Sequence, residues 1–297
     1  MESQAKLKWA VVGVGIAGRA RARAIDADPR ARLVAVYRGR FASEVEAPEV
    51  STLDEALASC DVVAIASPST EHPAQVEAAL RAGRHVVVEY PLATVAARAE
   101  ALYELADDVG RTLHVEHIEL LDPPSMTLRA HVRREVVKRV DVYFERAAPL
   151  GASAETLALG NVARLHRVTA LTGPLNRIVS VDHDGRSLTA ELALATGAMV
   201  HATFDQAPDL QRRTVLRIQT AGGVTWEQVN GTLTRNGAPQ TLLGVGSLFR
   251  RDQLEASAMI LDGKPDYVSR ERILHVLDMV ERLGRLETGG LPHRSAA

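Results

Sequence analysis

The chain has 297 residues, of which 46% are hydrophobic and 24% charged, with a formal net charge of −2. This length suits two domains, and the near-neutral charge gives no electrostatic case for binding nucleic acid or an anionic membrane. A single cysteine, Cys60, excludes an internal disulfide and a cysteine-rich metal site. Met1 to Lys8 contain no apolar signal core and no run approaches membrane-spanning length, so we expect a cytoplasmic protein.

The first part of the chain, up to about residue 117, alternates apolar strands with helical patterns. This order is typical of a parallel sheet with crossover helices, so we expect an α/β Rossmann dinucleotide-binding domain over residues 1–122. The expected strands are Lys8 to Val12, Leu33 to Tyr37, Val62 to Ala66, His85 to Glu89 and Thr112 to Glu116. The expected helices are Gly18 to Ala27, Leu53 to Ala58, Pro73 to Ala82 and Thr94 to Val109.

Three glycines connect the first strand to the first helix. Gly13 permits a tight turn, Gly15 lets the backbone approach a pyrophosphate, and Gly18 lets the helix pack against the strand. The helix dipole and its first amides then favour phosphate. A purely structural glycine turn is the alternative, but the strand before and the helix after favour a nucleotide. The residues expected at the pyrophosphate are Gly13, Val14, Gly15, Ile16, Ala17 and Gly18.

The end of the second strand predicts which dinucleotide binds. An NAD enzyme carries an acid there for the ribose hydroxyls, but no acid occurs between Asp28 and Glu44. Arg38 and Arg40 occupy this position instead, and a guanidinium can bind the extra phosphate of NADP. We therefore expect NADPH as cofactor, with NADH weaker and Arg38 the preferred contact. The alternative is that both arginines are merely solvated.

Polar residues follow the next strands, at the edge where the cofactor is expected. Ser67, Pro68 and Ser69 suit contact with the nicotinamide ribose, although a plain turn would look the same. His72 and Glu89 are further candidates for cofactor contact, and for His72 we favour packing or capping over catalysis.

Tyr90 precedes a proline, which holds it extended. Its phenol could donate a proton or a hydrogen bond, or its ring could line a flat pocket. An aromatic plug between domains is the alternative.

His114, Glu116, His117 and Glu119 alternate along and after the fifth strand. Residues two apart share a face of a strand, so His114 and Glu116 lie on one face and His117 on the other. No third ligand stands at a recognisable spacing. We expect a hydrogen-bonded cleft wall rather than a metal site.

Beyond Asp122 the pattern changes to an α+β domain, expected over residues 123–297, with a large, mainly antiparallel open sheet. Turn signals at Asp184-Gly185, Gly197, Gly222-Gly223 and Asn230-Gly231 predict hairpins. We expect a cleft between the two domains and C-terminal helices, about 248–287, that pack back toward the Rossmann domain. The expected helices are near Ser125 to Arg134, Leu159 to Leu171, Leu248 to Leu261 and Ser269 to Leu286, and the expected strands Val136 to Arg146, Arg177 to Asp182, Leu188 to Ala195, Met199 to Asp205, Thr214 to Thr220 and Val224 to Val229.

Arg164 lies on a partly apolar face of the helix Leu159 to Leu171. It either snorkels from the core or reaches toward an anionic ligand. No acid occurs between Glu155 and Asp182 to pair with it locally, which favours a ligand.

The most distinctive segments are His85 to Leu92 and Leu113 to Leu121, with a second match in Leu248 to Gln253 and Arg272 to His275. On these residues the chain resembles the glucose–fructose oxidoreductase (Gfo/Idh/MocA) superfamily and, within it, the biliverdin reductases, over nearly its whole length. Sugar-oxidising members carry Glu-Lys-Pro where this chain has Tyr90 in the middle position. They also carry an Asp-x-x-x-His pair on the helix with Arg164, and both departures remove acid–base groups that sugar oxidation needs.

This resemblance implies hydride transfer from NADPH to the central methine carbon (C10) of biliverdin, which gives bilirubin. Arg164 is then expected to orient the bilin or a water molecule, and Tyr90 to position substrate or guide protons. Arg167 and Arg251 are further candidates to bind the bilin propionates. The alternatives are another NADPH oxidoreductase of the superfamily, acting on an imine or small carbonyl, and a non-catalytic nucleotide sensor. The oligomeric state stays open between a monomer and a homodimer through the open sheet.

Overall fold

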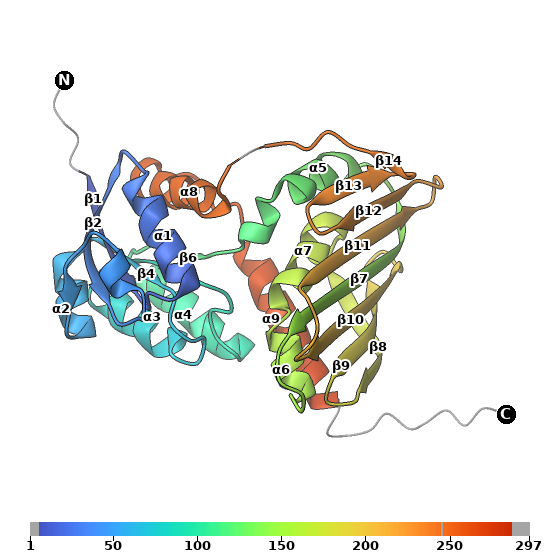
Figure 1. The fold of residues 1–297 in the computed structure, drawn as a ribbon, viewed down its shortest axis with the longest axis horizontal. Coiled ribbons are helices and arrows are strands. Elements are labelled where there is room, and N and C mark those ends of the chain that lie inside the picture. Colours follow the sequence, from blue (N-terminus) through green and yellow to red (C-terminus); the bar gives the residue numbers. More distant parts are fainter. Residues whose placement is uncertain (1–5, 245, 287–297) are drawn as a thin grey trace. The chain divides into compact units, whose positions relative to one another are not determined.

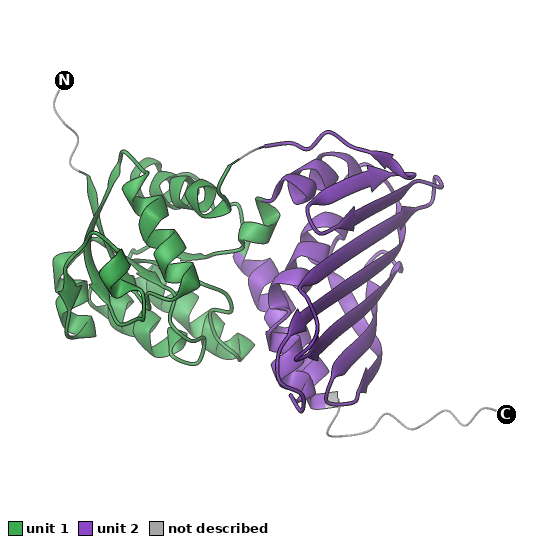
Figure 2. Cartoon of the chain, viewed as in Figure 1, with its two compact units in different colours: residues 1–121, 246–269 green, residues 122–245, 270–297 purple. Residues whose placement is uncertain are grey.

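The computed structural model describes residues 6–244 and 246–286. The chain forms two compact units, residues 1–121 with 246–269 and residues 122–245 with 270–297 (Figure 2). Sequence places both C-terminal helices in the second domain, whereas α8 (Leu248–Asp262) belongs to the first unit and α9 (Arg270–Leu286) to the second. The reason is packing, since α8 contacts α1 and α9 contacts α6 and α7.

The first unit contains a parallel sheet of order β3-β2-β1-β4-β5-β6 (Figure 1). This strand order confirms the Rossmann-type sheet, with its switch point between β1 and β4. The strands are β1 (Leu7–Val12), β2 (Ala31–Tyr37), β3 (Glu49–Val50), β4 (Val62–Ile65), β5 (His85–Val88) and β6 (Leu113–Val115). The helices are α1 (Ile16–Asp26), η1 (Ala42–Glu44), α2 (Leu53–Ser59), α3 (His72–Arg81), α4 (Ala96–Asp108), η2 (Ile118–Leu120) and α8.

Both faces of this sheet are covered. Four successive residues of β1, from Trp9 to Val12, are at most 1% exposed, so side chains on the two faces of the strand are buried alike. Such continuous apolar strands are typical of a parallel sheet between helical layers. The sheet therefore forms a rigid core whose carboxyl edge carries the loops of the site.

The second unit contains an eight-stranded sheet of order β14-β13-β12-β11-β7-β10-β9-β8. Only β7 and β10 pair in parallel among its described strands, which confirms a mainly antiparallel sheet. The strands are β7 (Val137–Ala147), β8 (Leu175–His183), β9 (Ser187–Leu194), β10 (Met199–Ala207), β11 (Arg213–Thr220), β12 (Thr225–Val229), β13 (Thr232–Arg235) and β14 (Ala238–Pro239). The helices are α5 (Pro123–Val132), α6 (Ala154–Leu159), α7 (Val162–Thr172) and α9.

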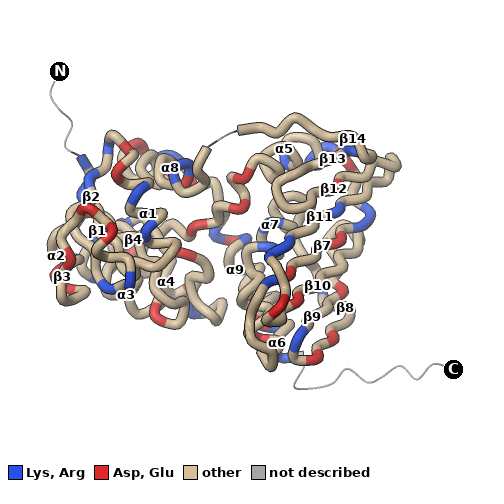
Figure 3. The backbone as a smooth tube through the Cα atoms, in the orientation of Figure 1, with Lys and Arg blue, Asp and Glu red and all other residues tan. Residues whose placement is uncertain are grey.

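Helices cover one face of this second sheet (Figure 1). Along β7, Val140, Val142 and Phe144 are buried, while Asp141 and Tyr143 between them are only half-buried. This period of two is what a sheet with one buried face requires. Basic and acidic residues are interspersed along both units, in keeping with the small net charge (Figure 3).

The expected hairpin turns all connect antiparallel strands. Asn230 has a φ of +50°, a left-handed conformation that asparagine tolerates better than most residues. A second asparagine with a left-handed conformation, Asn236, begins an Asn-Gly turn between β13 and β14. This turn was not among the expected hairpins. In the described part of the chain, no helix is both long and apolar enough to cross a membrane.

Candidate nucleotide and substrate site

The glycine loop between β1 and α1 is packed tightly at two of its three glycines. A Cβ on Gly13, whose φ is +87°, would lie 2.4 Å from the Ser67 nitrogen, and one on Gly18 would lie 2.1 Å from the Gly13 oxygen. A Cβ on Gly15, by contrast, would meet nothing within 4 Å. Gly13 and Gly18 therefore serve the turn and the packing, while Gly15 leaves open space for a ligand.

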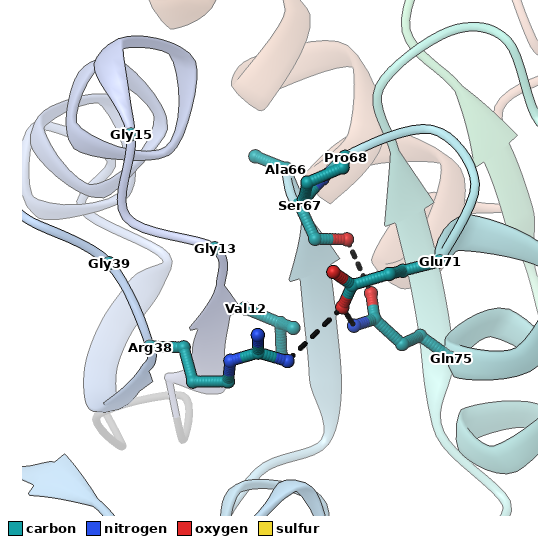
Figure 4. Close-up of a pocket in the computed structure, with 10 residues that line it drawn as sticks. All are labelled: Val12, Gly13, Gly15, Arg38, Gly39, Ala66, Ser67, Pro68, Glu71 and Gln75. Carbon is teal, nitrogen blue, oxygen red and sulfur yellow. Dashed lines mark hydrogen bonds and ion pairs between the residues drawn. The ribbon is translucent and has the colours of Figure 1, made fainter.

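A pocket of about 410 Å³ opens at this loop, at the carboxyl edge of the sheet (Figure 4). Of the residues that sequence assigns to the cofactor, Gly13, Gly15, Arg38, Ser67 and Pro68 line it. The sequence analysis missed the other lining residues, which are Val12, Gly39, Ala66, Glu71 and Gln75.

A chain of polar contacts crosses this pocket (Figure 4). The Arg38 guanidinium lies 3.2 Å from Glu71 Oε2, which also accepts a hydrogen bond of 2.9 Å from Gln75 Nε2. Ser67 Oγ in turn donates to Gln75 Oε1 at 2.5 Å. Arg38 is thus held at the pocket by Glu71, at the N-cap of α3.

The loop after β2 is fastened to the glycine loop through its backbone. Val14 N donates to the Arg38 oxygen at 2.7 Å, and a Cβ on Gly39, whose φ is +145°, would lie 2.4 Å from the same nitrogen. Because its amide is already bonded to Arg38, Val14 offers no free donor to a phosphate there. Gly39, between Arg38 and Arg40, is the sequence signal for this close approach.

The remaining predicted cofactor residues lie outside the pocket lining. Ile16 is 69% exposed at the start of α1, and the Arg40 guanidinium lies 4.6 Å from the centre of the Phe41 ring. Ala17 follows Ile16 in the first helical turn, whose amides have no partner within the helix. Ser69 lies in the β4–α3 turn and does not line the pocket.

His72 is buried beneath two loops of the site. Its Nδ1 lies 2.9 Å from the Pro91 oxygen and its Nε2 lies 2.8 Å from the Ser67 oxygen. The ring therefore bridges the loop after β4 to the loop after β5. This position fits the packing role and places His72 behind the pocket wall.

A buried cluster of charged residues lies at the ends of β5 and β6, against α1 and α8. Arg21 Nη2 on α1 contacts both Glu116 and Asp252, and all three side chains are at most 2% exposed. Burial lowers the pKa of Arg21, but the two carboxylates outweigh it and raise that pKa. Sequence reasoning missed this cluster because its members lie up to 231 residues apart.

His114 extends the cluster along β6. Its Nε2 lies 2.9 Å from Asp252 and its Nδ1 lies 2.9 Å from Asp266, while Tyr267 donates to Asp252 at 2.5 Å. Burial lowers the pKa of His114, but the two aspartates outweigh it and raise that pKa to about 10. Burial raises the pKa of Asp252, but the positive charges of Arg21 and His114 outweigh burial and lower that pKa below its usual value.

Tyr90 and His117 also lie just beyond the ends of β5 and β6. Their rings stack with centroids 5.5 Å apart and planes 7° from parallel. As expected, His114 and Glu116 face the same cluster, where His114 contacts Asp252 and Glu116 contacts Arg21, while the His117 ring stacks on Tyr90. Within the described residues, no group of three or more His, Cys, Asp or Glu side chains is arranged to hold a metal ion.

The predicted substrate arginines have different surroundings. Arg164 is 6% exposed on α7, and its guanidinium lies 3.9 Å from the centre of the Phe144 ring. Arg167 is also buried and donates to Gln228 Oε1 on β12. Arg251, in the first unit, donates to the Leu121 oxygen at 2.9 Å.

The chain is similar to known proteins both in its first unit and over nearly its whole length. Residues 7–117 match the family model described as an oxidoreductase family with an NAD-binding Rossmann fold. The chain is 28% identical to biliverdin reductase A of Mus musculus over 301 residues, which cover 96% of this chain and 97% of that protein. It is 27% identical to biliverdin reductase A of Homo sapiens over 304 residues, 95% and 96% of the two chains.

A solved structure is similar in fold to this chain over nearly its whole length. Biliverdin reductase from Synechocystis sp. PCC 6803, in complex with biliverdin and NADP+, matches with a TM-score of 0.80 and 26% identity. The match covers 94% of this chain and 98% of that one. With its glycine loop, its strand order and a first unit that matches this oxidoreductase family, the chain is an NAD(P)-dependent oxidoreductase.

Proposed function

We propose that this protein reduces biliverdin to bilirubin with NADPH, by hydride transfer to C10 of the bilin. The observation that carries the proposal is the extent of the similarity to biliverdin reductase A, which includes 96% of this chain. A match limited to the nucleotide domain would indicate only a shared cofactor. Here the match also includes the second unit, where Arg164 and Arg167 lie.

Two positions support the same substrate. Tyr90 stands where sugar-oxidising members of the superfamily have lysine, and Arg164 and Arg167 stand on the helix where those members have an Asp-x-x-x-His pair. Without these acid–base groups, oxidation of a sugar hydroxyl lacks its proton acceptor. An apolar dicarboxylate such as biliverdin instead needs aromatic and cationic side chains.

The first unit fits a dinucleotide. The open space above Gly15 and the adjoining pocket accommodate a pyrophosphate at the start of α1. We assign Arg38 to the 2′-phosphate of NADPH, since a guanidinium binds phosphate through charge-assisted hydrogen bonds. When bound, NADPH supplies the hydride.

The roles of the substrate residues follow from their chemistry. Guanidinium groups hold their protons tightly, so we assign Arg164 to orienting the bilin or a water molecule and to stabilising developing negative charge. Tyr90 positions the substrate or guides a proton, and its stacking on His117 fixes the ring. Arg167 and Arg251 are the weaker candidates for the propionates.

An absorbance scan of the protein with NADPH and biliverdin tests the proposal. We expect the red-absorbing biliverdin band to fall as the bilirubin band rises, at a rate proportional to protein concentration. Consumption of NADPH with a small imine or carbonyl, but not with biliverdin, would instead support another oxidoreductase of the family. Nucleotide binding without turnover of any of these compounds would support a sensor.

A further inference from the structure

Glu89 and Glu116 lie side by side at the carboxyl edge of the first sheet. They follow Val88 and Val115, which are paired residues of β5 and β6, and Glu116 N donates to the Val88 oxygen at 2.8 Å. In this strand order the first βα turn and β2 hold the adenosine half of a dinucleotide. The nicotinamide half then lies over β4, β5 and β6, where the two glutamates stand.

The two carboxyl groups are buried at neighbouring strand ends, and each has an oxygen without a donor in the described part of the chain. Oε2 of Glu116 accepts from Arg21. Oε1 of each glutamate is buried, and the described residues provide no N–H or O–H donor to either atom. Buried oxygens are almost always hydrogen-bonded, and two carboxylates side by side satisfy that need by sharing one proton.

The surrounding charges agree with a shared proton. The groups that act on Glu89 are Glu116, Arg21 on α1 and Asp252 on α8. Further along the cluster, two aspartates, Asp252 and Asp266, contact His114. The Arg21 guanidinium contacts two carboxylates, those of Glu116 and Asp252. No cation in the described cluster remains for a second ionised glutamate. Burial and the neighbouring Glu116 accordingly raise the pKa of Glu89 well above its usual range.

We propose that Glu89 and Glu116 share one proton at neutral pH and release it when the oxidised, positively charged nicotinamide binds beside them. This inference rests on the proposed binding of NADPH and NADP+. The reduced ring is neutral and leaves the pair protonated, whereas a positive charge nearby favours the ionised carboxylate. The pair thus responds to the redox state of the cofactor.

The proposed reaction consumes one proton for each hydride transferred, and the proton released by the glutamate pair matches that demand. In a turnover, C10 of the bilin would gain a hydride with its two electrons from the reduced nicotinamide, and a pyrrole nitrogen would gain one proton. The glutamate pair would release its proton toward that nitrogen as positive charge develops on the nicotinamide ring, and solvent would return a proton to the pair after NADP+ leaves. The pair therefore serves as a proton store matched to the hydride step.

Proton release on nucleotide binding, followed with a pH indicator in weakly buffered solution, tests the inference. We expect NADP+ to release more protons than NADPH, by up to one proton per bound nucleotide. Both nucleotides carry the same phosphates, so the difference between them reports the charge of the ring. We expect Glu89→Gln to abolish this difference, and Glu104→Gln, on the exposed surface of α4, to retain it.

A second measurement keeps the test independent of the variants. Infrared spectra of the wild-type protein labelled with 13C-glutamate should show a protonated carboxyl band at neutral pH that weakens when NADP+ binds. The inference is overturned if both nucleotides bind with equal proton release, or if the labelled protein shows no protonated glutamate. Failure of both nucleotides to bind would overturn the proposed function as well, so the two failures are distinguishable.

Discussion

Arg38 and Glu71 show how two residues that are distant in sequence meet in the cofactor pocket. No acid stands near Arg38 in the sequence, whereas Glu71, at the N-cap of α3, is 33 positions further on. It lies 3.2 Å from the guanidinium, so an incoming 2′-phosphate has to compete with a carboxylate. The sequence singles out Arg38, but only the fold, which brings the start of α3 to the pocket, shows its partner.

Replacing Arg38 with alanine should raise the KM for NADPH roughly tenfold, since a hydrogen bond to a charged group contributes about 1.5–3 kcal/mol. The KM for NADH should change little because NADH lacks the 2′-phosphate. Steady-state kinetics with both nucleotides measure this, and Arg32→Ala, at an exposed position of β2, the strand that precedes Arg38, is the matched control. An equal rise for both nucleotides would remove the assignment of Arg38.

Glu71→Gln should change the KM for NADPH in the opposite direction. The amide keeps the size of the side chain and removes the negative charge that faces the phosphate. We expect the ratio of kcat/KM for NADPH to that for NADH to rise several-fold, or about 1 kcal/mol in preference. An unchanged ratio would show that Glu71 moves away when the nucleotide binds.

Arg164→Ala should lower kcat at saturating biliverdin by at least about tenfold, because removal of one electrostatic stabiliser typically costs more than 1.4 kcal/mol. The Kd for NADPH, measured by fluorescence titration, should stay unchanged. Arg212 also lies near the Phe144 ring, at 5.7 Å, but is exposed, so Arg212→Ala controls for loss of an arginine from this ring. Unchanged turnover in Arg164→Ala would contradict the role given to it.

At the scale of elements, α8 lies beyond the boundary expected at residue 122, yet it packs within the first unit against α1. Its periodicity and the glycine at its end predict a helix correctly, and Gly263 indeed adopts a left-handed φ of +64°. Periodicity does not say which sheet a helix packs on. That choice comes from Asp252, which reaches Arg21 and His114 in a fully buried cluster.

The cluster makes stability depend on pH. The pKa of His114 rises from 6.5 to about 10 in the folded chain, so its contribution is complete below pH 6.5 and lost as pH rises toward 10. One such group gives a slope of up to about 1.4 kcal/mol per pH unit. Urea unfolding of His114→Asn across this range should show a weaker loss of stability than the wild type. An equal slope in both proteins would mean that His114 is neutral when folded.

For the whole molecule, sequence predicted the two sheet types because each has its own pattern. Apolar strands that alternate with helical patterns indicated the parallel sheet, and strands separated by turn residues indicated the antiparallel one. The short strands β3, β13 and β14 and the helix α6 were missed, since segments of two to six residues carry too little periodicity. The site was predicted best where backbone geometry demands glycine, and least where charges meet over long sequence distances.

The most direct test of the account follows the transferred hydrogen. Biliverdin is incubated with the protein and each of the two stereospecifically C4-deuterated forms of NADPH, and the product is analysed by mass spectrometry and NMR. The account predicts that one of the two forms yields bilirubin with a single deuterium on its C10 bridge. Absence of bilirubin, or bilirubin without deuterium at C10 from either form, would contradict it.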